Sequence, residues 1–250
     1  MNLDIDINSI EELRRDAYVT SIYSKMENDN IVGVFANKSD ALLIGYGFIP
    51  VPIVGVDSYI FEYSDLDNLC DPINSTIIYL KTKKCPLLFS SKFFVVDNYC
   101  DKFNKSLREN TSRDVIDEDL LAKYLNENFS ENYDKNSHDI AKEKLLKIDS
   151  ILDKLEKTDI KGNLLFKLKF YTRFINNLDD RISFLNKIAK DYKGFDNNRQ
   201  IIKASCPFAI SDVIDRKTQS NYKIKYSKSP QYTYRNCIYE GQEYITYKEI

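Results

Sequence analysis

Cysteine is the residue type whose placement in this chain most directly suggests chemistry. Cys70, Cys85 and Cys100 follow one another at intervals of 15 residues, and Cys206 lies much further along. Cys100 comes shortly after the apolar run 93–96, and Cys206 follows the strand-like run 200–204. Cysteine thiolates are the soft ligands that hold iron–sulfur clusters and zinc. A metal site is therefore the first function that these residues suggest.

The spacing of the cysteines leaves three interpretations open. Structural zinc sites use close pairs such as Cys-x2-Cys, and local ferredoxin runs are equally compact, yet neither pattern occurs in the sequence. A single cysteine in such a setting is most often a small buried hydrophobic residue. Iron–sulfur ligation, a structural zinc site and ordinary buried thiols therefore all remain possible on spacing alone.

The elements that would position these cysteines alternate between strand and helix. Apolar runs at 31–35, 48–53 and 93–96 predict strands, and the patterns at 40–47 and 66–80 predict helices between them. This alternation is typical of an α/β fold with a mostly parallel, Rossmann-like sheet. Ligands bind at the carboxyl ends of the strands in such sheets, which is where Cys100 would lie.

The rest of the chain divides by pattern into further regions around that α/β domain, which we place at 28–110. Residues 1–27 predict an N-terminal helix. The charged patterns of helical period at 117–129, 139–157 and 163–191 predict a helical region over 111–195. A strand-like run then opens 196–250, which is too short for a full doubly wound sheet because one βαβ unit takes roughly 30 residues. We therefore expect an incomplete second α/β lobe there.

Composition and charge exclude several classes of function. A net charge of −2 gives no electrostatic reason to expect nucleic acid as a partner. No apolar run approaches the ~20 residues that a membrane span needs, and the N-terminus is acidic where a secretory signal would be basic. We expect a cytoplasmic protein with reduced cysteines. The single histidine, His138, reads as a residue at a helix start, which disfavours histidine-based triads.

The cysteine segment also carries a family resemblance. Residues 68–102 contain, in order, Leu-Cys at Cys70, Lys-Cys-Pro at Cys85, a Val-Val run, and Cys-Asp at Cys100. This order and spacing resemble the signature of the 2-hydroxyacyl-CoA dehydratase family, which includes benzoyl-CoA reductase subunits and double-cubane cluster proteins. The segment 201–207 is similar to the family's Thr-Gly-Cys-Pro turn.

The resemblance implies an oxygen-sensitive [4Fe-4S] or double-cubane cluster held by cysteines. Cys70 and Cys100 would be its first ligands, with Cys85 and Cys206 as further candidates. An ATP-dependent activator protein and a second homologous subunit would be the partners. The assembled enzyme, a lyase or reductase, would transfer low-potential electrons to an acyl-CoA or another small molecule. Two features depart from the family: Lys102 stands where it has glycine, and residues 196–250 are too few to build the second lobe's sheet. The alternative is therefore a truncated, cluster-free member that acts as a scaffold or partner subunit.

Overall fold

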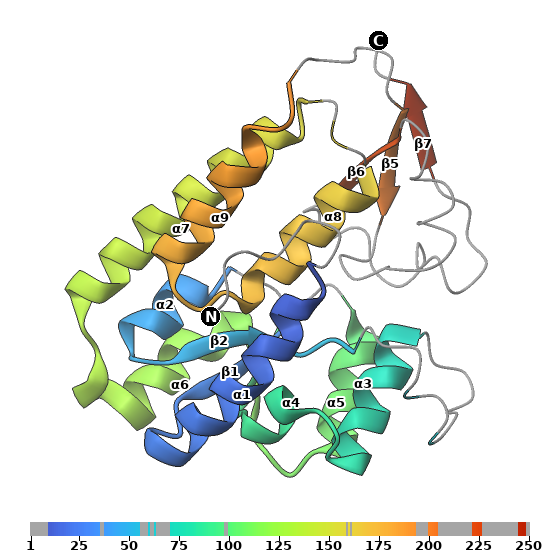
Figure 1. The fold of residues 1–250 in the computed structure, drawn as a ribbon. Helices are drawn as coiled ribbons and strands as arrows, with labels where there is room; N and C mark the ends of the chain where they lie inside the picture. Colours follow the sequence, from blue (N-terminus) through green and yellow to red (C-terminus); the bar gives the residue numbers. More distant parts are fainter. Residues whose placement is uncertain are drawn as a thin grey trace. The chain divides into compact units, whose positions relative to one another are not determined.

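The chain consists of two compact units (Figure 1). One unit is Arg14–Glu143, and the other joins Met1–Leu13 to Lys144–Ile250. The structure, a computed structural model, describes the following residues: 10–35, 38–55, 60, 63, 71–97, 100–158, 160, 162–193, 200–204, 222–226 and 245–248.

The unit Arg14–Glu143 is built on a four-stranded parallel sheet. Its strands are β1 (Ile31–Val34), β2 (Ile49–Pro52), β3 (Phe94–Val96) and β4 (Val115–Asp117). They lie side by side in the order β2-β1-β3-β4. The prediction of an α/β fold with a Rossmann-like parallel sheet is therefore confirmed. The order of the strands reverses between β1 and β3, the feature that marks ligand sites in such sheets.

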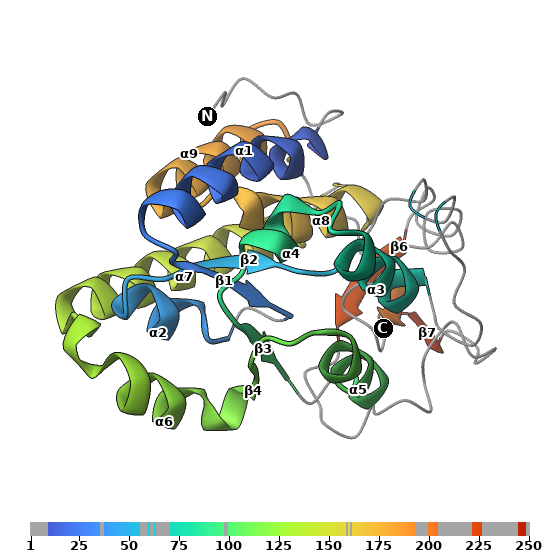
Figure 2. The ribbon, with the colours of Figure 1, turned by 90° about the horizontal axis from the view of Figure 1, so that it is seen from below.

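Helices cover both faces of this sheet. They are α1 (Glu12–Glu27), α2 (Asp40–Gly45), α3 (Asp71–Thr82), α4 (Pro86–Ser90), α5 (Asp101–Asn110), α6 (Glu118–Phe129) and the start of α7 (Lys135–Leu155). Figure 2 shows α2 and α6 on one side of the sheet and α1 and α4 on the other. On the α2 and α6 side, Val32, Val34 and Val95 pack with Leu43 and Leu121 in one buried cluster. Alternate residues of the strands therefore serve two separate apolar layers.

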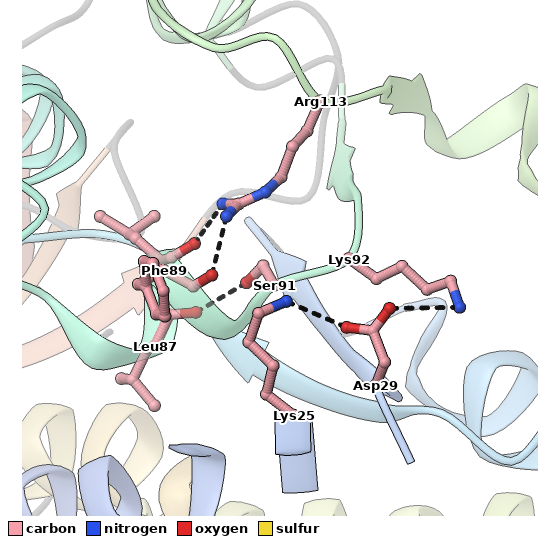
Figure 3. Close-up of polar contacts among 8 residues, drawn as sticks. Lys25, Asp29, Leu87, Phe89, Ser91, Lys92 and Arg113 are labelled. Carbon is pink, nitrogen blue, oxygen red and sulfur yellow. Dashed lines mark hydrogen bonds and ion pairs between the residues drawn. The ribbon is translucent and has the colours of Figure 1, made fainter. Parts of the chain in front are cut away.

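The short helix α4, which leads into β3, is held at its end by an arginine from the loop before β4. The guanidinium of Arg113 donates hydrogen bonds to the carbonyl oxygens of Leu88 and Phe89, at 2.5 and 2.7 Å (Figure 3). The hydroxyl of Ser91 donates to the carbonyl of Leu87 at 2.8 Å. The two bonds from Arg113 satisfy carbonyl groups that a helix end leaves without intrahelical partners, whereas the Leu87 carbonyl also accepts the backbone amide of Ser91. They also fasten the start of β4 beside the start of β3.

The turn from α1 into β1 depends on an aspartate in a left-handed conformation. Asp29 has φ 46°, a region that aspartate tolerates better than most residues. Its carboxylate lies 3.0 Å from Nζ of Lys25 and 3.5 Å from Nζ of Lys92 (Figure 3). Burial alone raises the pKa of Asp29, but the hydrogen bonds and charges of the two lysines outweigh it, so its pKa lies below the usual value.

The described part of the second unit contains the remainder of α7, the helices α8 (Gly162–Tyr171) and α9 (Leu178–Ala189) and a small mixed sheet. The strands of this sheet are β5 (Gln200–Ala204), β6 (Tyr222–Tyr226) and β7 (Ile245–Lys248). Strand β5 pairs in parallel with β6 and antiparallel with β7. The helical pattern at 163–191 corresponds to α8 and α9, with a break between them. A short 3-10 turn ends the first helix, and the Asn177 side chain starts the next by accepting hydrogen bonds from the amides of Asp179 and Asp180.

None of the helices in the described part of the chain has both the length and the apolar character needed to cross a lipid bilayer.

Candidate functional site

The carboxyl ends of β1 and β3 are the place where the fold itself favours a ligand site. These two strands are neighbours in the sheet, and the chain leaves them in opposite directions, toward β2 and toward β4. A crevice forms at such a reversal because the loops that follow the two strands diverge. The loop after β1 leads to Ser39 and α2, and the loop after β3 leads to Cys100 and α5.

Cys100 lies at this edge as the residue that caps the N-terminus of α5. Its backbone is extended, and its sulfur accepts a hydrogen bond from the amide of Phe103 at 3.3 Å. The side chain is half-buried. The aromatic ring of Phe103 is fully buried and packs on the ring of Phe35, which directly follows β1, with centroids 4.5 Å apart. The position of the sulfur is thus fixed by a core contact between α5 and the end of β1.

Buried polar groups gather at the same edge of the sheet. Among the described residues, the two buried acidic residues are Asp40 and Asp97, and they follow β1 and β3. The backbone carbonyl of Asp97 accepts a hydrogen bond of 2.6 Å from the side-chain amide of Asn104 in α5. Burying a carboxylate is costly unless it is paired or hydrogen-bonded. The edge that holds Cys100 is therefore polar although its surroundings are apolar.

A contact between α2 and α6 completes this edge. The hydroxyl of Ser39 donates a 2.8 Å hydrogen bond to Oε1 of Glu118, and Nζ of Lys38 lies 3.4 Å from Oε2 of the same carboxylate. Glu118 lies in the first turn of α6, and no local sequence pattern connects it with Lys38 and Ser39.

A shallow polar hollow of about 450 Å³ lies along the outer side of α5. Its lining residues are Asp101, Asn104, Lys105, Arg108, Glu109 and Asp117. Arg108 and Asp117 form an ion pair of 2.8 Å across it. Both signs of charge line the hollow, which suits solvent and small polar molecules better than an apolar group.

Cys85 occupies a different environment from Cys100. It directly precedes α4, before β3, and its side chain is buried. Its sulfur lies 4.0 Å from Nη2 of Arg14, a buried residue of α1. The guanidinium of Arg14 also lies 5.5 Å from the centroids of the Tyr18 and Tyr79 rings. Cys85 is therefore buried beside a cation inside the unit.

The other two predicted ligands, Cys70 and Cys206, lie outside the described residues. Within the described ranges, no three histidine, cysteine or acidic side chains come together as a metal site would require. Ligation by these four cysteines thus stays a prediction, and Cys100 is the one that the structure places at the expected strand end. Comparison with known proteins gave no significant match, either to a family model or to a curated protein.

Proposed function

We propose that this chain is an iron–sulfur subunit of the 2-hydroxyacyl-CoA dehydratase type, which transfers low-potential electrons to an acyl-CoA or another small molecule. The observation that carries the proposal is the position of Cys100, whose thiol lies at the carboxyl end of β3 beside the reversal of strand order. The order of motifs around Cys70, Cys85 and Cys100 supplies the family.

The surroundings of Cys100 fit a cluster ligand. Its half-buried sulfur accepts an amide hydrogen bond from Phe103, and hydrogen bonds to sulfur are one means by which proteins tune cluster potentials. When bound, a [4Fe-4S] or double-cubane cluster would supply one-electron chemistry at low potential. The residues of the chain would hold the iron through sulfur, and the packing of Phe103 on Phe35 would keep that sulfur in place.

The surroundings of Cys85 fit a ligand less well. Its sulfur is buried against Arg14, and a cluster could approach it only if that guanidinium moved. In our proposal Cys70 and Cys100 are therefore the first ligands, Cys206 is a further one, and Cys85 has a structural role. The assembled enzyme would take its electrons from an ATP-dependent activator protein and would act with a second homologous subunit in the cytoplasm.

The test compares three serine variants of the anaerobically purified full chain. We expect wild type and Cys85→Ser to contain iron and acid-labile sulfide with a brown cluster absorption, and Cys70→Ser and Cys100→Ser to lose most of both. Far-UV circular dichroism on each variant separates loss of ligand from loss of fold. Unchanged iron in the folded Cys100→Ser variant would overturn the proposal.

The wild-type protein also distinguishes the alternatives. A folded, colourless protein without metal would favour a cluster-free partner subunit. One zinc per chain, without sulfide, would favour a structural zinc site.

A further inference from the structure

Helix α1 carries apolar side chains on a face that its own unit leaves exposed. Val19, Ile22, Tyr23 and Met26 are 59%, 41%, 61% and 78% exposed. Their spacing of i, i+3, i+4 and i+7 places them in one stripe along the helix. We call these four residues the α1 stripe. A surface helix ordinarily shows polar residues on the side that faces water, so this arrangement requires an explanation.

The opposite side of α1 already provides the packing that the helix needs. Arg14, Ala17 and Ser21 are buried there, and Arg14 contacts Tyr79 of α3 and Cys85. The α1 stripe therefore adds nothing to the core of the unit Arg14–Glu143. By size, the stripe exposes roughly 450 Å², comparable with the largest apolar patch of a typical monomer, which is often functional.

We propose that the α1 stripe binds the same stripe of a second copy of this chain, with the two helices antiparallel about a two-fold axis near Ile22 and Tyr23. This inference does not depend on the proposed iron–sulfur function. Under that symmetry Val19 meets Met26 of the partner subunit, and Ile22 meets Tyr23 of the partner subunit. A two-fold interface uses the same patch on both subunits, and a single continuous stripe meets that requirement.

The charges at the two ends of the stripe favour the antiparallel arrangement. Arg15 is exposed near the N-terminal end, on the same side of the helix as Ile22 and Met26, and Glu27 is exposed at the C-terminal end. Antiparallel pairing offsets each Arg15 from Glu27 of the partner subunit by about three residues, roughly 5 Å, along the helix axes, so a long arginine side chain can reach across the contact toward that carboxylate. The pairing also sets the dipoles of the two helices in opposite directions.

The size of the contact predicts a weak dimer. Two stripes with their flanking polar residues bury on the order of 1,000–1,200 Å² in total, the low end for a specific interface. We therefore expect a dissociation constant in roughly the micromolar range, and reversible assembly.

Sedimentation velocity of the full chain, from roughly 1 to 200 µM, tests the proposal. We expect the weight-average mass to rise toward that of a dimer over this range. Ile22→Lys places two like charges at the axis and should weaken dimerisation at least about tenfold. Leu146→Lys is the matched control, because Leu146 in α7 is also an exposed apolar residue, at 62%, and lies outside the stripe. It should leave the dimer unchanged.

Charge reversal tests the antiparallel orientation itself. Arg15→Glu and Glu27→Arg should each weaken the dimer, and the double variant should recover most of the loss because it restores opposite charges across the axis. A chain that stays monomeric throughout, or a dimer that Ile22→Lys does not weaken, would overturn the proposal. A dimer in which the double variant is weaker than either single variant would overturn the antiparallel arrangement.

Discussion

Replacing Gly33 by alanine is the sharpest test of how the sheet beneath the candidate site is packed. Gly33 lies in β1, a central strand, opposite Val51 of β2 and Phe94 of β3. A Cβ at this position would lie 2.4 Å from Cγ2 of Ile53 and 2.6 Å from Cδ1 of Phe94. Both neighbours are buried, so neither side chain can turn away into solvent. The added methyl group must therefore displace packed side chains or push the strands apart.

The expected cost follows from these two contacts. Overpacking a well-filled core typically costs about 1–3 kcal/mol, and two contacts this short place Gly33→Ala toward the upper end. Part of that cost is offset, because replacing glycine reduces the entropy of the unfolded chain by about 0.4–1 kcal/mol. We expect a net loss of about 1–3 kcal/mol in the free energy of unfolding. In a chain of this size each kcal/mol lowers the melting temperature by about 2–4 °C.

A double-mutant cycle measured by urea unfolding separates this contact from a general effect on the strand. Ile53→Ala alone removes the Cγ2 atom and should cost about 2–5 kcal/mol by leaving a cavity. Combined with Gly33→Ala, the total loss should fall short of the sum by about 1 kcal/mol, because the new methyl group occupies part of that space. Gly47→Ala is the control, since Gly47 has φ 77° with nothing within 4 Å of the added methyl. It should destabilise without coupling to Ile53. The packing argument would be refuted if the losses in unfolding free energy of Gly33→Ala and Ile53→Ala simply added, or if Gly33→Ala left stability unchanged.

Two further predictions concern helix ends. Arg113→Ala removes both hydrogen bonds to the last carbonyls of α4 and should lower the free energy of unfolding, measured in urea, by about 1–3 kcal/mol. Arg113→Lys should recover only part of this loss, because an ammonium group cannot donate two parallel hydrogen bonds as a guanidinium does. Equal stability of wild type and both variants would contradict this prediction. The Ser137 hydroxyl, with the amides of Asn136 and Ser137, lowers the pKa of Asp134 at the start of α7. The stabilisation from its ionised form should therefore be complete above about pH 4 and be lost as the pH falls through the lowered pKa. Asp134→Ser should show a weaker acid dependence than wild type between pH 5 and pH 2, roughly, and an unchanged profile would argue against the cap.

The strands that contain enough apolar residues could be predicted from the sequence. The runs at 31–35, 48–53 and 93–96 correspond to β1, β2 and β3. Prolines are confined mostly to edge strands, and β2, which contains Pro50 and Pro52, lies at the edge of the sheet. His138 lies in the first turn of α7, where its ring accepts or donates a 2.9 Å hydrogen bond with Tyr133, in agreement with its reading as a helix-start residue.

Elements with weaker patterns escaped prediction. Strand β4 has only three residues, all half-buried, so neither length nor alternation distinguishes it from a loop. Helix α5 is mostly polar, and Phe103 and Leu107 are the two apolar residues that bury its inner face. The run Leu87–Phe89 is too short for periodicity to separate strand from helix, and it forms α4. In each case tertiary contacts decide the structure.

The candidate site shows the same division between local and long-range information. Cys100 could be assigned to a strand end because the apolar run before it is local in sequence. The contact between Ser39 and Glu118 joins residues 79 positions apart, and that between Arg14 and Cys85 joins residues 71 apart. Neither contact has a local signature, so the polar edge and the burial of Cys85 could be seen only in the folded chain.

Cys85 and Cys100 belong to one sequence motif, but they differ in the residues that surround them in the folded chain. Cys100 is placed by strand β3 on one side and by the buried ring of Phe103 on the other, so its sulfur can meet a ligand without disturbing the core. Cys85 is buried against the guanidinium of Arg14, which itself lies over the rings of Tyr18 and Tyr79. If the sequence motif alone determined which cysteines bind iron, Cys85→Ser and Cys100→Ser would lose the same amount of iron. Retention of iron by Cys85→Ser and its loss from Cys100→Ser would instead show that the fold selects the ligand from the motif.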